Sequence, residues 1–160
     1  GVGTVLRLIT RRFDARTGRL YYEILLSRGA TIWVPVSGTA SGLRRLPAKD
    51  ELARCRSLLS SRPPPLSADH RQRQLEVAAR LKAGTMQARC EVVRDLTAHS
   101  WSKPLCQSSA ELLRKAQAAL DEEWSAVAEL PVQEVAHQVR ELLLEGRRAF
   151  ESKRLADRPG

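Results

Sequence analysis

The spacing of apolar residues changes near Pro47, and this change constrains the fold more than any other feature of the sequence. Before Pro47, apolar residues come in short alternating runs, which is the pattern of half-buried strands. After it, they recur every three or four residues, which is the pattern of amphipathic helices. The sequence therefore predicts an α+β protein, in which a small antiparallel sheet domain is followed by an all-α helical domain.

The first part of the chain is expected to form three short strands, at residues 4–9, 20–26 and 31–36. The segments between them, 14–19 and 27–30, are rich in turn formers and predict hairpins. Pro35 has no N–H to donate, so the third strand lies at a sheet edge or its pairing ends there. Short strands joined by tight turns indicate a strongly twisted sheet or open barrel.

Five helices are expected in the rest of the chain. The first lies near 48–60, with Pro47 in its first turn. The others are predicted from their caps and breakers: one capped by Ser67 and stopped at Gly84, one capped by Thr85, one capped by Ser108 or Ser109 and interrupted by Pro131, and one after Pro131. The expected core positions are Leu52, Cys55, Leu58, Leu59, Met86, Cys90, Val93, Leu96, Leu112, Leu113, Ala116, Leu120, Trp124, Val127, Val135, Val139, Leu142, Leu143 and Phe150.

Three consecutive prolines at 63–65 are the clearest breaker in the chain. They favour a stiff, extended polyproline segment, and a domain boundary is expected there. We therefore expect a β domain at 1–46, a connecting helix and linker at 47–65, a helical domain at 66–150 and a disordered basic tail at 151–160.

The composition narrows the class of protein. The 160 residues carry a formal net charge of +9, which indicates an anionic partner. Residues 1–48 hold eight Arg and two acidic residues, so +6 of this charge lies in the predicted sheet domain. No apolar run approaches the ~18 residues of a membrane span. Three scattered cysteines without CxxC spacing argue against a disulfide framework or a zinc site and suit a reducing cytoplasm.

The sequence contains no motif for catalysis. Its histidines, His70, His99 and His137, fall in different predicted helices without a recognisable nucleophile setting. No glycine-rich phosphate loop, HExxH motif or paired-carboxylate motif is present. We therefore expect a protein that is not an enzyme and that uses no cofactor or metal.

The order of short motifs along the chain is more specific than any one of them. The series runs through Gly1-Val2-Gly3, Val34-Pro35-Val36, Gly42-Leu43-Arg44, Leu81-Lys82-Ala83-Gly84, Glu91-Val92-Val93-Arg94-Asp95-Leu96, Lys103-Pro104-Leu105 and Leu112-Leu113-Arg114-Lys115-Ala116. From residue 1 to about 145 the chain resembles the CarD/CdnL family of bacterial transcription regulators that bind RNA polymerase. The stretch from Glu91 to Leu96, at its distance after Gly84, carries most of this resemblance. Members of the family carry a further strand before the Gly-Val-Gly, so an incomplete sheet is expected here.

The resemblance implies a division of labour between the two domains. The family's N-terminal domain is a Tudor-like sheet, shared with the transcription-repair coupling factor, that docks on the polymerase β subunit by strand-edge pairing. Its C-terminal helical domain contacts promoter DNA at the upstream edge of the transcription bubble, where a Trp wedge in the minor groove stabilises the open complex. The implied protein is a monomer of the cytoplasm, associated with the nucleoid through polymerase and not with a membrane.

The resemblance also implies positions for the polymerase contact. Arg11 matches a basic contact of the family, with Arg12 and Phe13 beside it. Trp33 lies at or next to another contact position and is equally suited to a core. The alternative for Arg11 and Arg12 is that both are solvated residues at a strand end.

On the DNA side the chain departs from the family pattern. The position of the wedge Trp is occupied by His70, followed by Arg71 and Arg73. Imidazole is a poor wedge, so we expect DNA contacts mainly to phosphates, with weaker bubble stabilisation. Arg71, Arg73, Arg80 and Lys115 are the expected contacts; the alternative for His70 is an ordinary helix residue without a partner.

Five further residues have structural interpretations. Trp101 is expected to pack on neighbouring helices, although it could supply an alternative aromatic contact, and Trp124 is expected in the core. Glu91, Arg94 and Asp95 are expected to form an ion-pair and capping network.

Two other functions stay open at this level. The chain could be a polymerase-binding interaction module with little DNA activity, because the wedge Trp is absent. It could also be a basic RNA-binding protein whose sheet reads nucleic acid directly. The aromatic content of 4% counts against that second alternative, because single-strand readers need stacking platforms.

Overall fold

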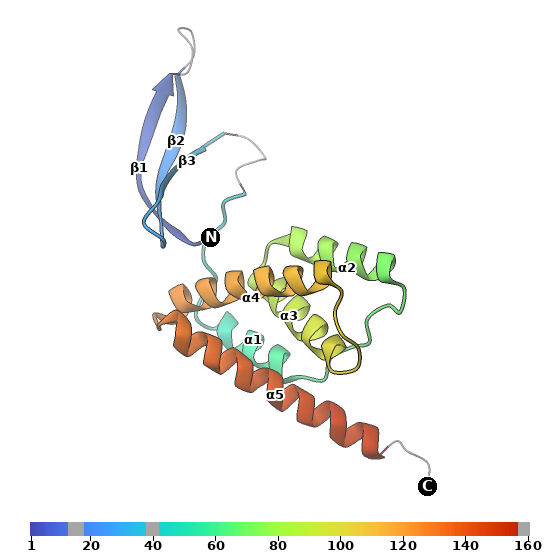
Figure 1. The fold of residues 1–160 in the computed structure, drawn as a ribbon. Helices are drawn as coiled ribbons and strands as arrows, with labels where there is room; N and C mark the ends of the chain where they lie inside the picture. Colours follow the sequence, from blue (N-terminus) through green and yellow to red (C-terminus); the bar gives the residue numbers. More distant parts are fainter. Residues whose placement is uncertain (13–17, 38–41, 157–160) are drawn as a thin grey trace. The chain divides into compact units, whose positions relative to one another are not determined.

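The computed structural model describes residues 1–12, 18–37 and 42–156, with side chains described through Ser152. The described chain divides into two compact units, residues 1–46 and 47–160, of which the first holds a three-stranded antiparallel sheet and the second five helices (Figure 1). The predicted α+β layout is confirmed. None of the described helices is long and apolar enough to cross a membrane.

The sheet is a meander in the order β1 (Gly3–Arg12), β2 (Gly18–Leu26) and β3 (Thr31–Pro35). Gly29 turns the second hairpin with a φ of 83°, a left-handed conformation that costs glycine little. Pro35 is the last paired residue of β3, an edge strand, as its missing N–H predicts. The predicted turn at 14–19 falls mostly outside the described residues.

A bulge at Leu6 determines which side chains share a face of the sheet. Val5 pairs with Ile24, and Arg7 pairs with the preceding residue of β2, Glu23, so one residue of β1 has no partner. An extra residue reverses the alternation of the strand from that point on. Arg7 therefore lies on the face opposite to Val5, although the two are an even number of residues apart.

The sheet buries little of its apolar surface. Ile24 is the only residue of the described part of this unit that is fully buried. Large apolar side chains stay at least 36% exposed along all three strands and after them: Val5, Leu6, Leu8, Leu20, Leu25, Ile32, Trp33, Val36, Leu43 and Leu46. Hydrophobic burial within the described sheet therefore contributes little to its stability.

The helical unit is built around α3 (Met86–Ser100), which packs against each of the other four helices. These are α1 (Glu51–Ser60), α2 (His70–Ala83), α4 (Gln107–Ala128) and α5 (Val132–Ala156). Figure 1 shows α5 running along α1 and continuing beyond it. The core contains Leu52, Cys55, Leu59, Val77, Met86, Cys90, Val92, Val93, Leu96, Ala116, Leu120, Trp124, Val127, Val135, Val139 and Leu143. Most of the predicted core is thus confirmed; Leu58, Leu112, Leu113 and Leu142 pack against it partly buried, and Phe150 is half-buried.

The helix ends show where local rules succeed. Thr85 caps α3 by accepting a hydrogen bond from the Ala88 N–H, and Gly84 ends α2 with a φ of 70°. Both were expected, because a threonine hydroxyl and a left-handed glycine meet the needs of helix ends. Pro131 separates α4 from α5, also as expected.

Other predicted helix ends were wrong. Asp69, not Ser67, caps α2, because its carboxylate accepts a hydrogen bond from the Gln72 N–H at 2.7 Å. Cys106, rather than either predicted serine, is the N-cap residue of α4. Pro47 precedes α1 instead of lying in its first turn, since α1 begins at Glu51. The last helix continues to Ala156, so residues 151–156 of the predicted disordered tail are helical, and residues 157–160 lie outside the described residues.

The segment from Pro47 to the prolines belongs to the helical unit. Leu52, Cys55 and Leu59 of α1 are core residues, and Pro63 is buried. The division between compact units therefore falls between residues 46 and 47, whereas the sequence places a connecting helix and spacer at 47–65. Burial of one face of α1 against α3 and α5 holds this segment in place.

Candidate functional site

A charged and aromatic cluster lies on one face of the sheet. The register aligns Arg7, Glu23 and Trp33 across the three strands, and the Arg7 guanidinium pairs with the Glu23 carboxylate. Hydrogen bonding from Arg7 lowers the pKa of Glu23, and Trp33 and Arg11 add to this effect. The bulge at Leu6 is what places Arg7 opposite Glu23. Sequence reasoning did not anticipate this pair, because a bulge has no local signature here.

Arg11 and Trp33, both predicted contact residues, are in direct contact. The Arg11 guanidinium lies 3.9 Å from the centroid of the Trp33 ring, within the range of a cation–π interaction. Trp33 stays 41% exposed, so it lies on the surface of the described sheet and not in a core. Arg12 is exposed at the end of β1, and Phe13 lies outside the described residues.

The predicted DNA-contacting residues are distributed over α2 and α4. His70 and Arg71 are exposed in the first turn of α2, and Lys115 is exposed on α4 in an i,i+4 ion pair with Glu111 at 2.9 Å. Arg71 forms no ion pair within the described part of the chain. These side chains can therefore meet phosphates at little cost, because exposed ion pairs are weak.

Arg73 was also predicted to contact DNA, but it is not exposed. Its side chain is buried, and its Nη1 donates to the Ser67 carbonyl oxygen at 2.7 Å. This bond holds the segment before α2 against the helix. Arg73 is therefore a structural residue and not an exposed phosphate contact.

Arg80 is also engaged within the fold. Its Nη1 lies 2.6 Å from Asp95 Oδ2, while Arg94 Nε lies 2.7 Å from Asp95 Oδ1. Arg94 also donates to the Ser61 hydroxyl at 3.0 Å. The expected network around Asp95 is thus confirmed for Arg94, with Arg80 and Ser61 as further members. Glu91 instead accepts a hydrogen bond from Gln87 of its own helix.

His70 has a partner that its position in the sequence does not reveal. Its Nε2 lies 3.1 Å from the Sγ of Cys106, the N-cap residue of α4. The contact joins the N-terminal ends of α2 and α4. The alternative of a His70 without a partner was therefore wrong.

The remaining tryptophans have the expected surroundings. Trp124 is fully buried in the core. Trp101, after α3, lies 5.9 Å from the Phe150 ring of α5 between ring centroids, with Arg147 near its face. Trp101 thus packs on a neighbouring helix, as predicted.

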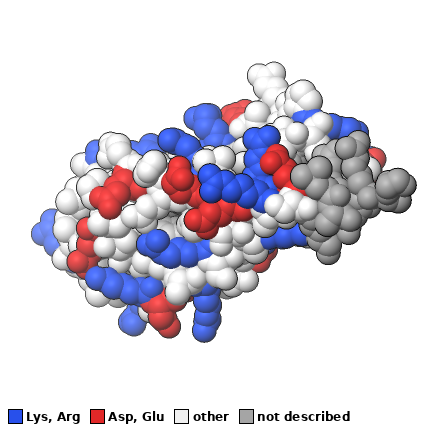
Figure 2. Space-filling model, turned by 90° about the horizontal axis from the view of Figure 1, so that it is seen from below, with Lys and Arg blue, Asp and Glu red and all other residues white. Residues whose placement is uncertain are grey.

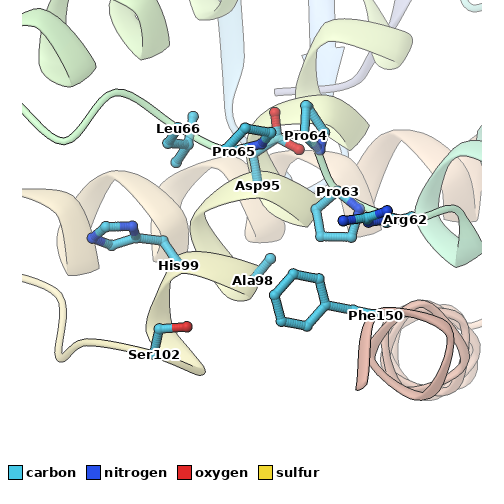
Figure 3. Close-up of a pocket in the computed structure, with 10 residues that line it drawn as sticks. All are labelled: Arg62, Pro63, Pro64, Pro65, Leu66, Asp95, Ala98, His99, Ser102 and Phe150. Atoms are coloured by element: carbon cyan, nitrogen blue, oxygen red, sulfur yellow. The ribbon is translucent and has the colours of Figure 1, made fainter. Parts of the chain in front are cut away.

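A cavity of about 270 Å³ lies between the proline segment, α3 and α5 (Figure 3). Pro63, Ala98 and Phe150 give it an apolar wall, and the Asp95 carboxylate at its edge is already paired. Burial, with Arg73 and Lys103 nearby, lowers the pKa of His99, which also lines it. Asp95 in this cavity is thus held in a structural network, and the surroundings of His99 favour its neutral form. Among the described residues, no three His, Cys, Asp or Glu side chains are placed to hold a metal ion.

The charge on the surface is mixed. On the face that Figure 2 shows, Lys and Arg are interspersed with Asp and Glu and do not form one continuous patch. Residues 49–160 carry 19 basic and 16 acidic residues, a balance of +3. Such a surface favours a small number of phosphate contacts over a broad electrostatic footprint.

The helical unit is similar to a known protein family. A family model described as the C-terminal domain of CarD matches residues 55–140, more than half of the chain. The matched region includes the Asp95 network and the contact between His70 and Cys106. No curated protein matches the chain.

Proposed function

Because the chain belongs to the CarD family, which consists of transcription regulators and not of enzymes, we propose that it binds RNA polymerase and promoter DNA with separate units. The match to the CarD C-terminal domain over residues 55–140 is the observation that carries this proposal. We assign binding of the polymerase β subunit to residues 1–46 and DNA contact near the upstream edge of the transcription bubble to residues 66–150. The outcome is a change in open-complex stability, in the cytoplasm of a bacterial cell.

Two features of the sheet support the polymerase assignment. β1 is an outer strand of the described sheet, and an unpaired strand edge can accept a further strand from a partner. Arg11 at its end is stacked on Trp33, and Arg12 is exposed beside it. Arginine is the side chain best suited to pair bidentately with carboxylates, so an acidic strand-edge partner fits this face.

The DNA contact is proposed to be weaker than in family members that have a wedge Trp. Arg71 and Lys115 reach phosphates, which position DNA without reading its sequence. His70 replaces the wedge, and its imidazole already faces Cys106. A wedge stabilises a kinked, unstacked base step, so its absence reduces bubble stabilisation.

Charge reversal tests the polymerase contact. The double variant Arg11→Glu, Arg12→Glu is expected to lose capture of RNA polymerase by at least tenfold. Arg28→Glu, Arg45→Glu is the matched control, because it makes the same change in net charge at exposed positions of the same unit. Equal capture of RNA polymerase by the two double variants would show that Arg11 and Arg12 do not form the docking site.

Open-complex lifetime on a linear promoter tests the DNA contact. The wild-type protein is expected to lengthen the lifetime modestly, and His70→Trp is expected to lengthen it further. Polymerase capture without any effect of the wild-type protein on lifetime would favour a pure interaction module. The engagement of His70 by Cys106 is the observation that favours that second candidate.

A further inference from the structure

The contact between His70 and Cys106 brings a nucleophile and a base together from two helices. His70 is the first residue of α2, and Cys106 is the N-cap residue of α4. Their Nε2 and Sγ atoms are 3.1 Å apart, and both residues are exposed. An imidazole at this distance can take the thiol proton, and free N–H groups at a helix N-terminus favour the resulting thiolate.

Two hydroxyl groups complete the surroundings of the sulfur. Ser108 Oγ and Ser109 Oγ lie 3.3 Å and 3.2 Å from Cys106 Sγ. Gln74 Nε2 of α2 donates to both hydroxyls, at 3.3 Å and 2.7 Å. The Cys106 thiol donates to the Ser109 hydroxyl, and once the sulfur has lost its proton both hydroxyls can donate to the thiolate. Hydrogen bonds from Ser108 and Ser109, with a smaller contribution from His70, lower the pKa of Cys106 to about 6.

The other two cysteines provide a contrast within the same chain. Cys55 and Cys90 are buried in the core of the helical unit, at 1% and 0% exposure. A hydrogen bond to Cys55 and burial raise the pKa of Cys90. Both thiols are inert toward reagents in solution because neither is accessible. Cys106 is therefore chemically distinct from both.

We propose that Cys106 and His70 form a reactive thiol site that is oxidised by a hydroperoxide and then capped by a low-molecular-weight thiol. In the first step the thiolate sulfur attacks peroxide, an S–O bond forms and the O–O bond breaks. The sulfur is oxidised by two electrons to a sulfenic acid, and the leaving hydroxide or alkoxide takes the proton that the thiol gave to His70 and departs as water or an alcohol. In the second step the low-molecular-weight thiol displaces water from the sulfenic sulfur, forming a mixed disulfide. With Cys55 and Cys90 buried, the capping thiol comes from solution.

The modification changes the protein surface at the N-terminal end of α2. The capped sulfur no longer accepts a hydrogen bond as a thiolate, and the added group lies beside His70 and Arg71. If the DNA contact proposed above is correct, the bulk of the adduct hinders it. Oxidation is then expected to lower DNA affinity about tenfold or more.

Alkylation of the folded full-length chain tests the site itself. The rate of carbamidomethylation by iodoacetamide, followed by mass spectrometry, is measured between pH 5 and pH 9. Cys106 is expected to react with a midpoint near pH 6, against about 8.5 for an ordinary thiol, while Cys55 and Cys90 stay unmodified. A midpoint at or above pH 8 for Cys106, or equal labelling of all three cysteines, overturns the proposal.

Three variants show whether the surroundings cause this reactivity. Ser108→Ala is expected to raise the midpoint by about one pH unit, and His70→Asn by less. Ser100→Ala is the matched control, since its exposed hydroxyl bonds only to the Thr97 carbonyl oxygen of its own helix. An unchanged midpoint in both Ser108→Ala and His70→Asn contradicts the proposed surroundings.

Hydrogen peroxide with glutathione tests the two-step reaction. The expected product carries one glutathionyl group on Cys106, is reversed by dithiothreitol and is absent from Cys106→Ser. Absence of this adduct in the wild-type protein overturns the capping step. Fluorescence anisotropy then compares the affinities of the modified and unmodified chains for a promoter duplex. Equal affinities would show that the adduct does not hinder DNA binding. If the unmodified chain does not bind the duplex, the proposed DNA function fails, and the labelling results still decide the thiol site.

Discussion

The Arg80 guanidinium lies 2.6 Å from the carboxylate of Asp95, which is 1% exposed, and this pair joins α2 to α3. Arg94 occupies the other carboxylate oxygen and reaches the Ser61 hydroxyl at the end of α1. One buried carboxylate thus organises residues from three segments of the helical unit. A buried charge is costly unless it is paired in this way.

Asp95→Asn is expected to destabilise the helical unit by about 3 kcal/mol, because it leaves two guanidinium groups without their buried counter-charge. The free energy of unfolding from urea titration, followed by far-UV circular dichroism, measures this loss. Glu111→Gln is the control, since it removes an exposed pair with Lys115 worth less than ~0.5 kcal/mol. Similar losses in both variants would mean that Asp95 contributes no more than a surface pair.

Gly84→Ala is expected to cost about 1 kcal/mol, because alanine at a φ of 70° carries the steric penalty of the left-handed region. Gly84→Asn is expected to lose less, since asparagine tolerates this conformation better. Thermal unfolding of the two variants measures the order. Gly146→Ala is not a suitable control, because a Cβ there would approach the Leu59 carbonyl oxygen to 3.1 Å.

Much of this fold follows from local rules. The hairpin at Gly29, the cap at Thr85 and the stop at Gly84 each depend on a few neighbouring residues, so the sequence predicts them. The cap of α2 could also have been predicted from the sequence. Asp69 followed by Gln72 matches the spacing of a capping box, and Asp69 caps the helix in place of Ser67.

The features that the sequence did not predict depend on contacts across the fold. A bulge at Leu6 is chosen by the pairing of β1 with β2. Arg73 looks like an exposed helix residue until the preceding segment folds back over it. The contact between His70 and Cys106 joins residues 36 positions apart, and cysteine is not a usual N-cap residue, so no local pattern points to it.

Asp121 makes the stability of the helical unit depend on pH. Burial raises the pKa of its carboxyl to about 6, partly opposed by Arg140, and Oδ1 has no hydrogen-bond partner among the described residues. Its folded pKa lies above the unfolded value near 4, so its favourable contribution is complete below pH 4 and lost as the pH rises through 6. Asp121→Asn is therefore expected to stabilise the protein by about 2 kcal/mol at pH 7.5 and by much less at pH 4.

The measurement for Asp121 is the free energy of unfolding of both proteins across this range. Asp50→Asn is a suitable control, because Asp50 is an exposed carboxylate before α1. A benefit of Asp121→Asn that is the same at pH 4 and at pH 7.5 would rule out titration of Asp121 as its cause.

The proposed DNA contacts predict a specific salt dependence. Each phosphate contact releases counterions, so log Kobs falls with log salt concentration by about 0.9 per contact. Arg71→Ala is expected to reduce the magnitude of this slope by about 1 and to weaken binding equally on different promoter sequences, because a phosphate contact reads no bases. Lys115→Ala should act in the same way.

Arg73→Ala distinguishes the loss of a phosphate contact in Arg71→Ala from the general effect of removing one positive charge. It removes the same formal charge from the same helix, but its guanidinium is buried and bonded to the Ser67 carbonyl oxygen. It is therefore expected to lower the free energy of unfolding and leave the salt slope near that of the wild type, whereas Arg71→Ala changes the slope and leaves stability intact. Equal slopes for Arg71→Ala and the wild-type protein, measured by anisotropy over 50–200 mM salt, would remove Arg71 from the interface.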